Sequence, residues 1–223
     1  LARGIDIYAG YGLSETCPVL SFAVLTPGNE DDVAARVRTG KPLPLVDLRI
    51  VDEDMAEQPR DGASIGEVVV RAPWLNVEYL KSPQATAELW RGGMMHTGDV
   101  GHIDASGTLQ ITDRMKDVIK SGGEWVSSLA LESIASTVDG VSEVAAFSVP
   151  DPKWGERPLM LVVAAKQADQ NALEVAIKVA FGDAVSSGRL SKWAVPQEIR
   201  FVNEIAKTSV GKIDKKALRA ALA

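Results

Sequence analysis

The feature that most constrains the fold is a change of pattern near residue 114. Before it, short apolar runs rich in β-branched residues alternate with turn-forming residues, which is typical of a mostly β subdomain. The turn signals are Asp52-Glu53-Asp54, Asp61-Gly62 and Asp104-Ala105-Ser106-Gly107. They predict strands over residues 5–8, 46–51, 66–71, 96–103 and 109–113. One short helix is expected over 82–89, with Ser82 as its cap and Pro83 in its first turn.

After residue 114, strand patterns alternate with helix patterns. Strands are expected over residues 116–120, 143–149, 159–165 and 195–202, and helices over 127–138, 172–181 and 214–222. The sequence therefore predicts an α+β fold, in which a small mostly-β subdomain, residues 1–113, is followed by a compact α+β domain, residues 114–223. The boundary between them is expected at residues 114–116.

Composition narrows the class of protein. Of the 223 residues, 46% are hydrophobic and 24% are charged, which suits one or two globular domains. No apolar run reaches the roughly 18 residues that a membrane helix needs, so we expect no transmembrane segment and a cytoplasmic protein. The net charge of −6 argues against broad nucleic-acid binding.

Cysteine and histidine give no sign of a disulfide or a metal centre. Cys17 is the only cysteine, so an internal disulfide is excluded, and we interpret it as an ordinary loop or core residue. His96 and His102 lie six residues apart on strand-like sequence, which is not a metal-binding spacing. The first residues, Leu1-Ala2-Arg3-Gly4-Ile5-Asp6-Ile7-Tyr8-Ala9, read as the interior of a folded protein rather than as a signal peptide, and we expect a longer parent chain.

Lys212 is the strongest candidate for a catalytic charge. It follows the small-residue loop Thr208-Ser209-Val210-Gly211 and precedes the last expected helix. A flexible ammonium on such a loop can bridge a carboxylate and a phosphate. By composition alone, a solvated lysine in a basic tail is the better interpretation.

The loop Tyr11-Gly12-Leu13-Ser14-Glu15-Thr16 follows an expected strand. A glycine lets the backbone approach a phosphate closely, and a hydroxyl beside a carboxylate suits a phosphate oxygen and its Mg²⁺. The alternative is a plain polar loop.

Two further residues could contact a nucleotide. Asp99 follows Thr97-Gly98 at a strand end, where a carboxylate commonly accepts hydrogen bonds from ribose hydroxyls. Arg114 could add a donor. A turn aspartate and a surface ion pair are the respective alternatives.

Lys116, Lys120 and the run Ser121-Gly122-Gly123-Glu124-Trp125 follow directly. Paired glycines leave room for a narrow ligand, and they suit a tight hairpin turn equally well.

These segments, taken in order, resemble the AMP-forming adenylating enzymes, which include acyl-CoA synthetases, luciferases and peptide-synthetase adenylation domains. The resemblance implies that residues 1–113 are the last, β-rich subdomain of a large nucleotide-binding domain. Residues 114–223 would be the mobile C-terminal domain, and the upstream phosphate loop and acyl pocket would lie outside this chain. Trp125 and the stretch Asp151-Pro152-Lys153-Trp154-Gly155-Glu156-Arg157-Pro158 resemble the fatty-acyl-CoA branch. We interpret this stretch mainly as a structural turn, from which Lys153 or Arg157 could contact the edge of CoA.

The resemblance also implies roles for individual residues. For the nucleotide, Tyr11 would stack on adenine beside Gly12, Ser14 would contact the α-phosphate, and Asp99 and Arg114 would hold the ribose. Glu15 would hold Mg²⁺. The family more often has threonine where this chain has Ser14, and serine keeps the hydroxyl that would contact the α-phosphate. For the chemistry, Lys212 would serve acyl-AMP formation and Lys120 would serve thioester formation. Lys116 would be the hinge about which the C-terminal domain turns between these two steps. Coenzyme A would pass along Gly122, Gly123, Glu124 and Trp125.

The implied function is that of a fatty-acid–CoA ligase. ATP would activate a medium- or long-chain acid to acyl-AMP, and CoA would then take the acyl group. The fragment itself is expected to be inactive, and unpaired strand edges would favour self-association. The alternatives are a ligase for an aryl or other acid, or for a carrier-protein acceptor, and a non-catalytic nucleotide- or CoA-binding homologue.

Overall fold

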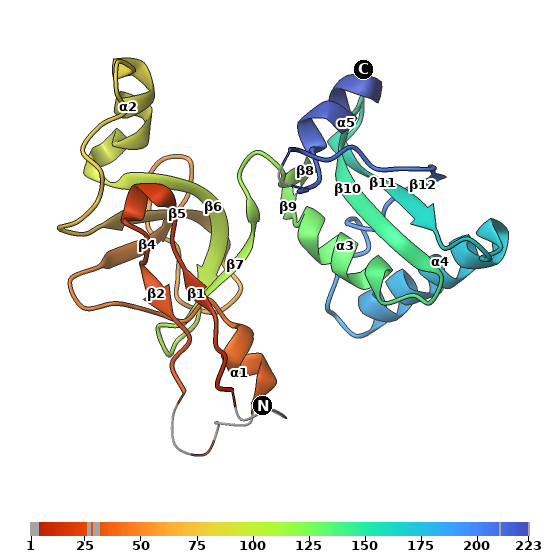
Figure 1. Ribbon diagram of the computed structural model, residues 1–223, viewed down its shortest axis with the longest axis horizontal. Coiled ribbons are helices and arrows are strands. Elements are labelled where there is room, and N and C mark those ends of the chain that lie inside the picture. Colours follow the sequence, from red (N-terminus) through yellow and green to blue (C-terminus); the bar gives the residue numbers. More distant parts are fainter. Residues whose placement is uncertain (1–4, 26–27, 29–31, 210, 223) are drawn as a thin grey trace. The chain divides into compact units, whose positions relative to one another are not determined.

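The computed structural model describes residues 5–25, 28, 32–209 and 211–222. The expectations for Leu1-Ala2-Arg3-Gly4 and for Val210 fall outside these residues. The chain divides into two compact units, Leu1–Met115 and Lys116–Ala223 (Figure 1). We describe them separately as unit 1 and unit 2.

Unit 1 is built on a four-stranded antiparallel sheet. Its strand order is β4 (Asp47–Val51), β5 (Gly66–Arg71), β6 (Met95–Ile103) and β7 (Leu109–Arg114). The four strands expected in this region are therefore confirmed, with bounds shifted by at most one residue. The central strand β5 is buried along almost its whole length, which explains its unbroken valine run.

A smaller three-stranded sheet completes unit 1. It contains β1 (Gly10–Tyr11), β2 (Ser21–Phe22) and β3 (Lys41–Pro42). The strand expected over residues 5–8 is wrong: this segment is irregular, and Ile5, Ile7 and Tyr8 are exposed. Its apolar residues indicated a strand, but among the described residues no neighbouring strand pairs with it.

Short helices connect the strands of unit 1. The helix α1 (Val33–Val37) is capped by Asp32, whose carboxylate accepts from the Ala34 N–H. The helix α2 (Pro83–Leu89) has Ser82 at its N-cap and proline at its first position, as expected. The 3-10 turns η1 (Ser14–Thr16) and η2 (Arg91–Gly93) lie at two of the bends.

Unit 2 is built on a five-stranded mixed sheet. The strands β10 (Val141–Asp151) and β11 (Gly155–Ala164) form its long central hairpin. The hairpin of β8 (Ile119–Ser121) and β9 (Glu124–Val126) joins β11 on one part of its length, and β12 (Glu198–Phe201) pairs with β11 in parallel on another. The α+β class predicted from the sequence is confirmed.

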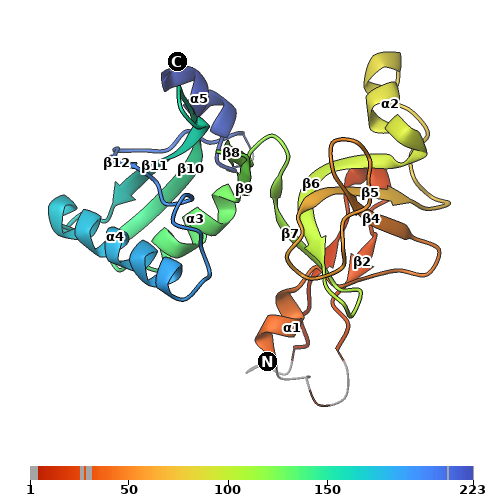
Figure 2. The same cartoon turned by 180° about the vertical axis from the view of Figure 1, so that it is seen from behind.

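Helices cover both faces of this sheet. On one face, α3 (Ser128–Ser136) and α4 (Gln170–Ser186) pack side by side (Figure 2). Ser127 and Asp169 cap them through side-chain bonds to the first-turn N–H groups. On the other face, α5 (Lys215–Leu222) packs against β10. Because both faces are buried, β10 and β11 appear in the sequence as nearly continuous apolar runs.

The strand expected over residues 116–120 is largely wrong. Residues 115–117 form a turn, and only Ile119 and Lys120 of the expected strand lie in β8. The chain here leaves the sheet of unit 1 and enters that of unit 2, so the first residues have no neighbouring strand. Within the described residues, no helix is both long and apolar enough to span a membrane.

Candidate active site

The nucleotide residues predicted in unit 1 converge on the carboxylate of Asp99. Asp99 lies on β6 directly opposite Arg114 on β7, and the Arg114 Nε is 3.2 Å from Asp99 Oδ1. The Tyr11 hydroxyl, carried by β1, donates to Asp99 Oδ2 at 2.8 Å. The structure thus brings together three residues that are up to 103 positions apart in the sequence.

Burial dominates the electrostatics of this cluster. The Asp99 side chain is only 6% exposed, and this burial raises the pKa of its carboxyl above the ordinary value, while the Tyr11 hydrogen bond and the Arg114 charge lower it. Burial, followed by the charge of Asp99, raises the pKa of Tyr11. Tyr11 is therefore a neutral hydrogen-bond donor at physiological pH. Arg114 is about half exposed and keeps donors available to a ligand.

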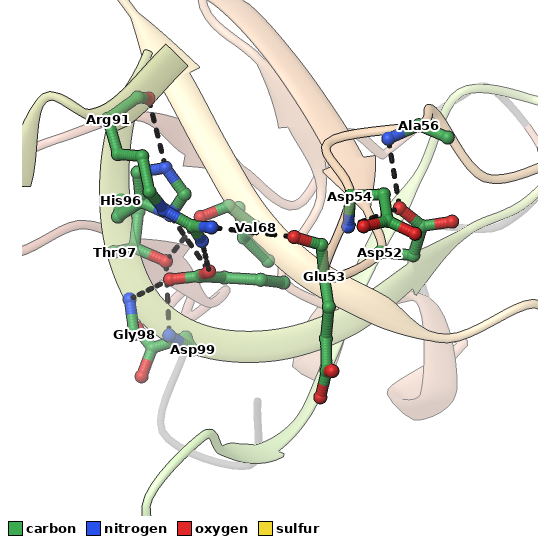
Figure 3. Close-up of polar contacts among 11 residues, drawn as sticks. Asp52, Glu53, Asp54, Ala56, Val68, Arg91, His96, Thr97, Gly98 and Asp99 are labelled. Carbon is green, nitrogen blue, oxygen red and sulfur yellow. Dashed lines mark hydrogen bonds and ion pairs between the residues drawn. The ribbon is translucent and has the colours of Figure 1, made fainter.

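A buried carboxylate supports the turn that carries Asp99. Glu67, on β5, accepts from the Gly98 N–H at 3.2 Å and lies 2.8 Å from His96 Nδ1. His96 also contacts the Arg91 carbonyl at 3.1 Å, and the Thr97 hydroxyl donates to the Val68 carbonyl (Figure 3). These bonds fix the path of β6 on both sides of Gly98.

The loop after β1 is shaped by its own packing. A Cβ added at Gly12 would lie 1.7 Å from the carbonyl oxygen of Pro18, so no other residue fits without moving the loop. Ser14 is exposed on η1, and the Glu15 carboxylate accepts from the Tyr79 hydroxyl at 2.8 Å. Cys17, just beyond, is an exposed free thiol, as the loop interpretation predicted.

Mg²⁺ binding at Glu15 is compatible with this geometry. The carboxylate is half-buried and offers a second oxygen beyond the one bound to Tyr79. Among the described residues, no group of three or more potential metal-ligating side chains occurs. A single carboxylate nevertheless suits Mg²⁺, which usually keeps waters and substrate phosphates as its remaining ligands.

In unit 2, the predicted CoA residues form the β8–β9 hairpin. Gly122 and Gly123 make its turn with φ of 61° and 85°, the left-handed conformation that a two-residue hairpin turn needs. The structure therefore contains the tight hairpin turn that the sequence suggested as one interpretation of the paired glycines. Lys120 lies over the Trp125 ring at 5.2 Å, and the Glu124 carboxylate accepts from the Ser191 hydroxyl.

The two glycines of this turn differ in their surroundings. A Cβ at Gly122 would lie 2.9 Å from the Trp154 ring, whereas a Cβ at Gly123 would meet no atom within 4 Å. The space beside Gly123 is therefore open, which a narrow ligand would need. The stretch 151–158 is a structural turn, as predicted, because the Asp151 carboxylate accepts from the Lys153 and Trp154 N–H groups.

Arg157 lacks the exposed position that a contact with the edge of CoA would need. Its guanidinium is buried and donates to the Trp193 carbonyl at 3.0 Å. A CoA-edge contact from Arg157 is therefore wrong for this structure.

Lys212 lies on a short loop closed at its base. The Thr208 N–H donates to the Lys212 carbonyl at 2.7 Å, and the backbones of Lys207 and Ile213 form an isolated antiparallel β-bridge. The Lys212 side chain is exposed. Lys116, the predicted hinge, is exposed in the turn where unit 1 ends and unit 2 begins. The preceding Met115 N–H donates to the Gly98 carbonyl, and the following Asp117 carboxylate accepts from the Arg219 guanidinium.

Sequence reasoning missed the supporting residues. Glu67 could have been found as a lone charge in an otherwise apolar strand, since a buried carboxylate needs partners. Tyr79 gave no signal, because its link to Glu15 joins residues 64 positions apart.

Comparisons with known proteins identify the family of this chain. Residues 1–80 match the family described as "AMP-binding enzyme", and residues 130–212 match "AMP-binding enzyme C-terminal domain". Together these matches cover most of the chain. The chain belongs to the AMP-binding enzyme family, the adenylate-forming ligases, and the resemblance predicted from the sequence is confirmed.

The chain is similar to several characterised members of this family. It is 38% identical to a long-chain-fatty-acid–CoA ligase of Thermus thermophilus over 97% of its own length and 40% of that protein. It is 36% identical to a 3-methylmercaptopropionyl-CoA ligase of Ruegeria lacuscaerulensis, again over 97% of the chain and 39% of the relative. The structure of the anthranilate CoA ligase AuaEII in complex with anthranoyl-AMP aligns with a TM-score of 0.80 and 28% identity, over 98% of this chain and 40% of that one. The chain thus spans about 40% of the length of these relatives.

Proposed function

We propose that this chain is part of an AMP-forming fatty-acid–CoA ligase. In the first step, the carboxylate of a medium- or long-chain acid attacks the α-phosphorus of ATP, and pyrophosphate leaves. In the second step, the thiol of CoA attacks the acyl carbonyl, and AMP leaves. The similarity to fatty-acid and methylmercaptopropionyl CoA ligases supports this assignment.

The observation that carries the proposal is the buried carboxylate of Asp99 with its two donors. Two ribose hydroxyls can donate to a carboxylate that Tyr11 and Arg114 hold in place. Tyr11 itself offers a ring for the adenine, and Gly12 and Ser14 lie one and three residues beyond it for the sugar and phosphate. This set would bind the AMP part that ATP and acyl-AMP share, so it would serve both steps.

The attack joins two anions, so the first step needs positive charge placed in advance. Lys212 would supply it, because its exposed ammonium is carried on a closed loop. Glu15 would hold Mg²⁺, which would neutralise phosphate charge when bound. The proposed second step uses Lys120 and the hairpin turn, where Gly123 leaves space for the pantetheine arm beside Glu124 and Trp125.

The hinge role proposed for Lys116 is supported by its neighbours. Met115 is bound within unit 1 and Asp117 within unit 2, so the torsions at Lys116 lie between two fixed points. Hinges commonly concentrate a rotation in a few such residues. Residues 1–113 and 114–223 would then act as parts of a large nucleotide-binding domain and a mobile C-terminal domain.

A test of the function uses the longer parent protein. Pyrophosphate release is measured with acids from acetate to palmitate and with benzoates, each with and without CoA. Release with medium or long fatty acids, followed by thioester formation only with CoA, is expected. Release confined to aryl acids would instead favour the second candidate, an aryl-CoA ligase, which the likeness to an anthranilate CoA ligase supports.

A pair of variants tests the two-step mechanism. Lys212→Ala is expected to slow acyl-AMP formation by about 10²-fold, the scale of losing one preorganised charge, and to spare thioester formation from supplied acyl-AMP. Lys120→Ala is expected to show the reverse pattern. Equal losses in both steps would contradict the separate roles. The 223-residue chain alone is expected to form no acyl-CoA.

A further inference from the structure

A buried lysine lies three residues after Lys212. Lys215, the first residue of α5, is 8% exposed, although the sequence places it in a run of basic residues that suggests a solvated tail. Its Nζ lies 2.7 Å from Glu132 Oε1 and 2.6 Å from the Ser128 hydroxyl, both on α3. Its neighbour Lys216 is exposed.

The acceptor side of this ion pair is fixed independently. Glu132 is itself only 13% exposed, and its Oε1 also accepts from the Ala146 N–H on β10 at 2.8 Å. Burying a charge is favourable only when it is paired and hydrogen-bonded, so the site accepts an ammonium in one position. Lys215 thereby ties the first turn of α5 to both α3 and β10.

The rest of α5 is weakly held. It has eight residues, too few to be stable as an isolated helix. Among its described side chains, Leu218 is the one buried apolar contact, and Arg219 adds a partly exposed bond to Asp117. The ion pair of Lys215 is therefore the buried polar contact that holds the first turn of α5 against α3.

The start of α5 is also the base of the Lys212 loop. The Asp214 N–H donates to the Ala206 carbonyl at 2.8 Å, and the Asp214 carboxylate caps the helix by accepting from the Ala217 N–H. Any shift of the first turn of α5 would displace this closure, and with it Lys212. A displacement of about 1 Å at a reacting group can cost about 10²-fold in rate.

We infer that Lys215, paired with Glu132 and Ser128, is a positioning residue that sets the place of the Lys212 ammonium for acyl-AMP formation. This inference rests on the proposed function. It assigns a distinct purpose to each of two neighbouring lysines: Lys215 orders the protein, whereas Lys212 reaches the substrate.

The first test needs no catalysis. Backbone hydrogen exchange is measured on the 223-residue chain for the N–H groups of Thr208 and Asp214, which close the loop. Lys215→Met is expected to speed their exchange by about 10-fold or more, while the matched control Lys216→Met leaves it unchanged. Wild-type exchange rates in Lys215→Met would overturn the inference, whether or not the parent protein is a ligase.

The second test separates positioning from simple stability. In the longer parent protein, Lys215→Met is expected to slow pyrophosphate release by about 10-fold or more and to leave thioester formation from supplied acyl-AMP within about threefold. Lys215→Arg, which keeps the charge, is expected to restore most of the first step, and Glu132→Gln should impair the same step. Equal loss of both steps, or no rescue by arginine, would overturn the inference. Failure of the wild-type parent to release pyrophosphate with any acid would instead overturn the proposed function.

Discussion

The hydrogen bonds of Glu67 to the turn that carries Asp99 allow us to predict how much free energy of unfolding is lost when Glu67 is replaced. In Glu67→Ala, the Gly98 N–H and the ring of His96 each lose a buried partner. Leaving a buried polar group unpaired costs about 1–3 kcal/mol, so two such groups predict a loss of about 2–6 kcal/mol in the free energy of unfolding of unit 1. Glu67→Gln keeps an acceptor for Gly98 and an amide that can donate to His96, and is expected to cost less than about 1.5 kcal/mol.

The assay must report on unit 1 alone. Urea unfolding followed by NMR signals of N–H groups in β5 and β6 gives that free energy, while signals from β10 and β11 in unit 2 serve as an internal reference. Glu57→Ala is the matched control, because this exposed glutamate pairs only with Arg60 at 3.3 Å within the described structure, and such pairs contribute about 0–1 kcal/mol. In the parent protein, the affinity for ATP should fall in the same order as the stability.

Two outcomes would refute this reasoning. Equal costs for Glu67→Ala and Glu67→Gln would show that the charge, rather than the pair of hydrogen bonds, matters. A cost below about 0.5 kcal/mol for Glu67→Ala would show that water replaces the carboxylate and that the turn does not depend on it.

Two further predictions concern the site. Tyr11→Phe removes a hydrogen bond that lowers the pKa of Asp99, so this pKa should rise further. A carboxyl group with a higher pKa in the folded than in the unfolded state reduces stability as the pH rises above the unfolded value of about 4, so the variant should lose more stability than the wild type over that range. Urea unfolding of β6, followed by NMR at several pH values, measures this loss, and an unchanged pH profile would contradict the prediction. Gly122→Ala should destabilise the β8–β9 hairpin, because its Cβ would lie 2.9 Å from Trp154, whereas Gly123→Ala carries only the strain of its backbone conformation; equal thermal stability of the two variants would contradict this difference.

The sequence predicted the elements whose signals are local. Strands β4 to β7 are bounded by aspartate and glycine turns, and α2 has a serine cap and proline start, so short-range chemistry was sufficient. Strand expectations failed at residues 5–8 and 116–118, because these segments have no neighbouring strand in the described structure. Pairing depends on a distant segment, which a local pattern does not contain.

The candidate site shows the same division. The resemblance pointed to Tyr11, Asp99 and Arg114, and the structure brings these side chains together, although their roles stay predictions. It did not point to Lys215, because a basic run looks alike whether its lysines are solvated or buried. Only the position of Glu132, 83 residues earlier, distinguishes the two cases.

The two-faced sheet of unit 2 has a consequence for natural variation. Along β10, the even-numbered Val144 and Ala146 face α3 and α4, while the odd-numbered Ala145 and Phe147 face the side covered by α5. From Val144 to Phe147, beyond the β-bulge near Val141, the parity of a position therefore decides which layer of the domain a substitution disturbs. Changes at these odd positions reach the helix that follows the Lys212 loop, so drift there would disturb the placement of Lys212 that we propose for acyl-AMP formation. Drift at the even positions would mainly change the stability of the packing against α3 and α4.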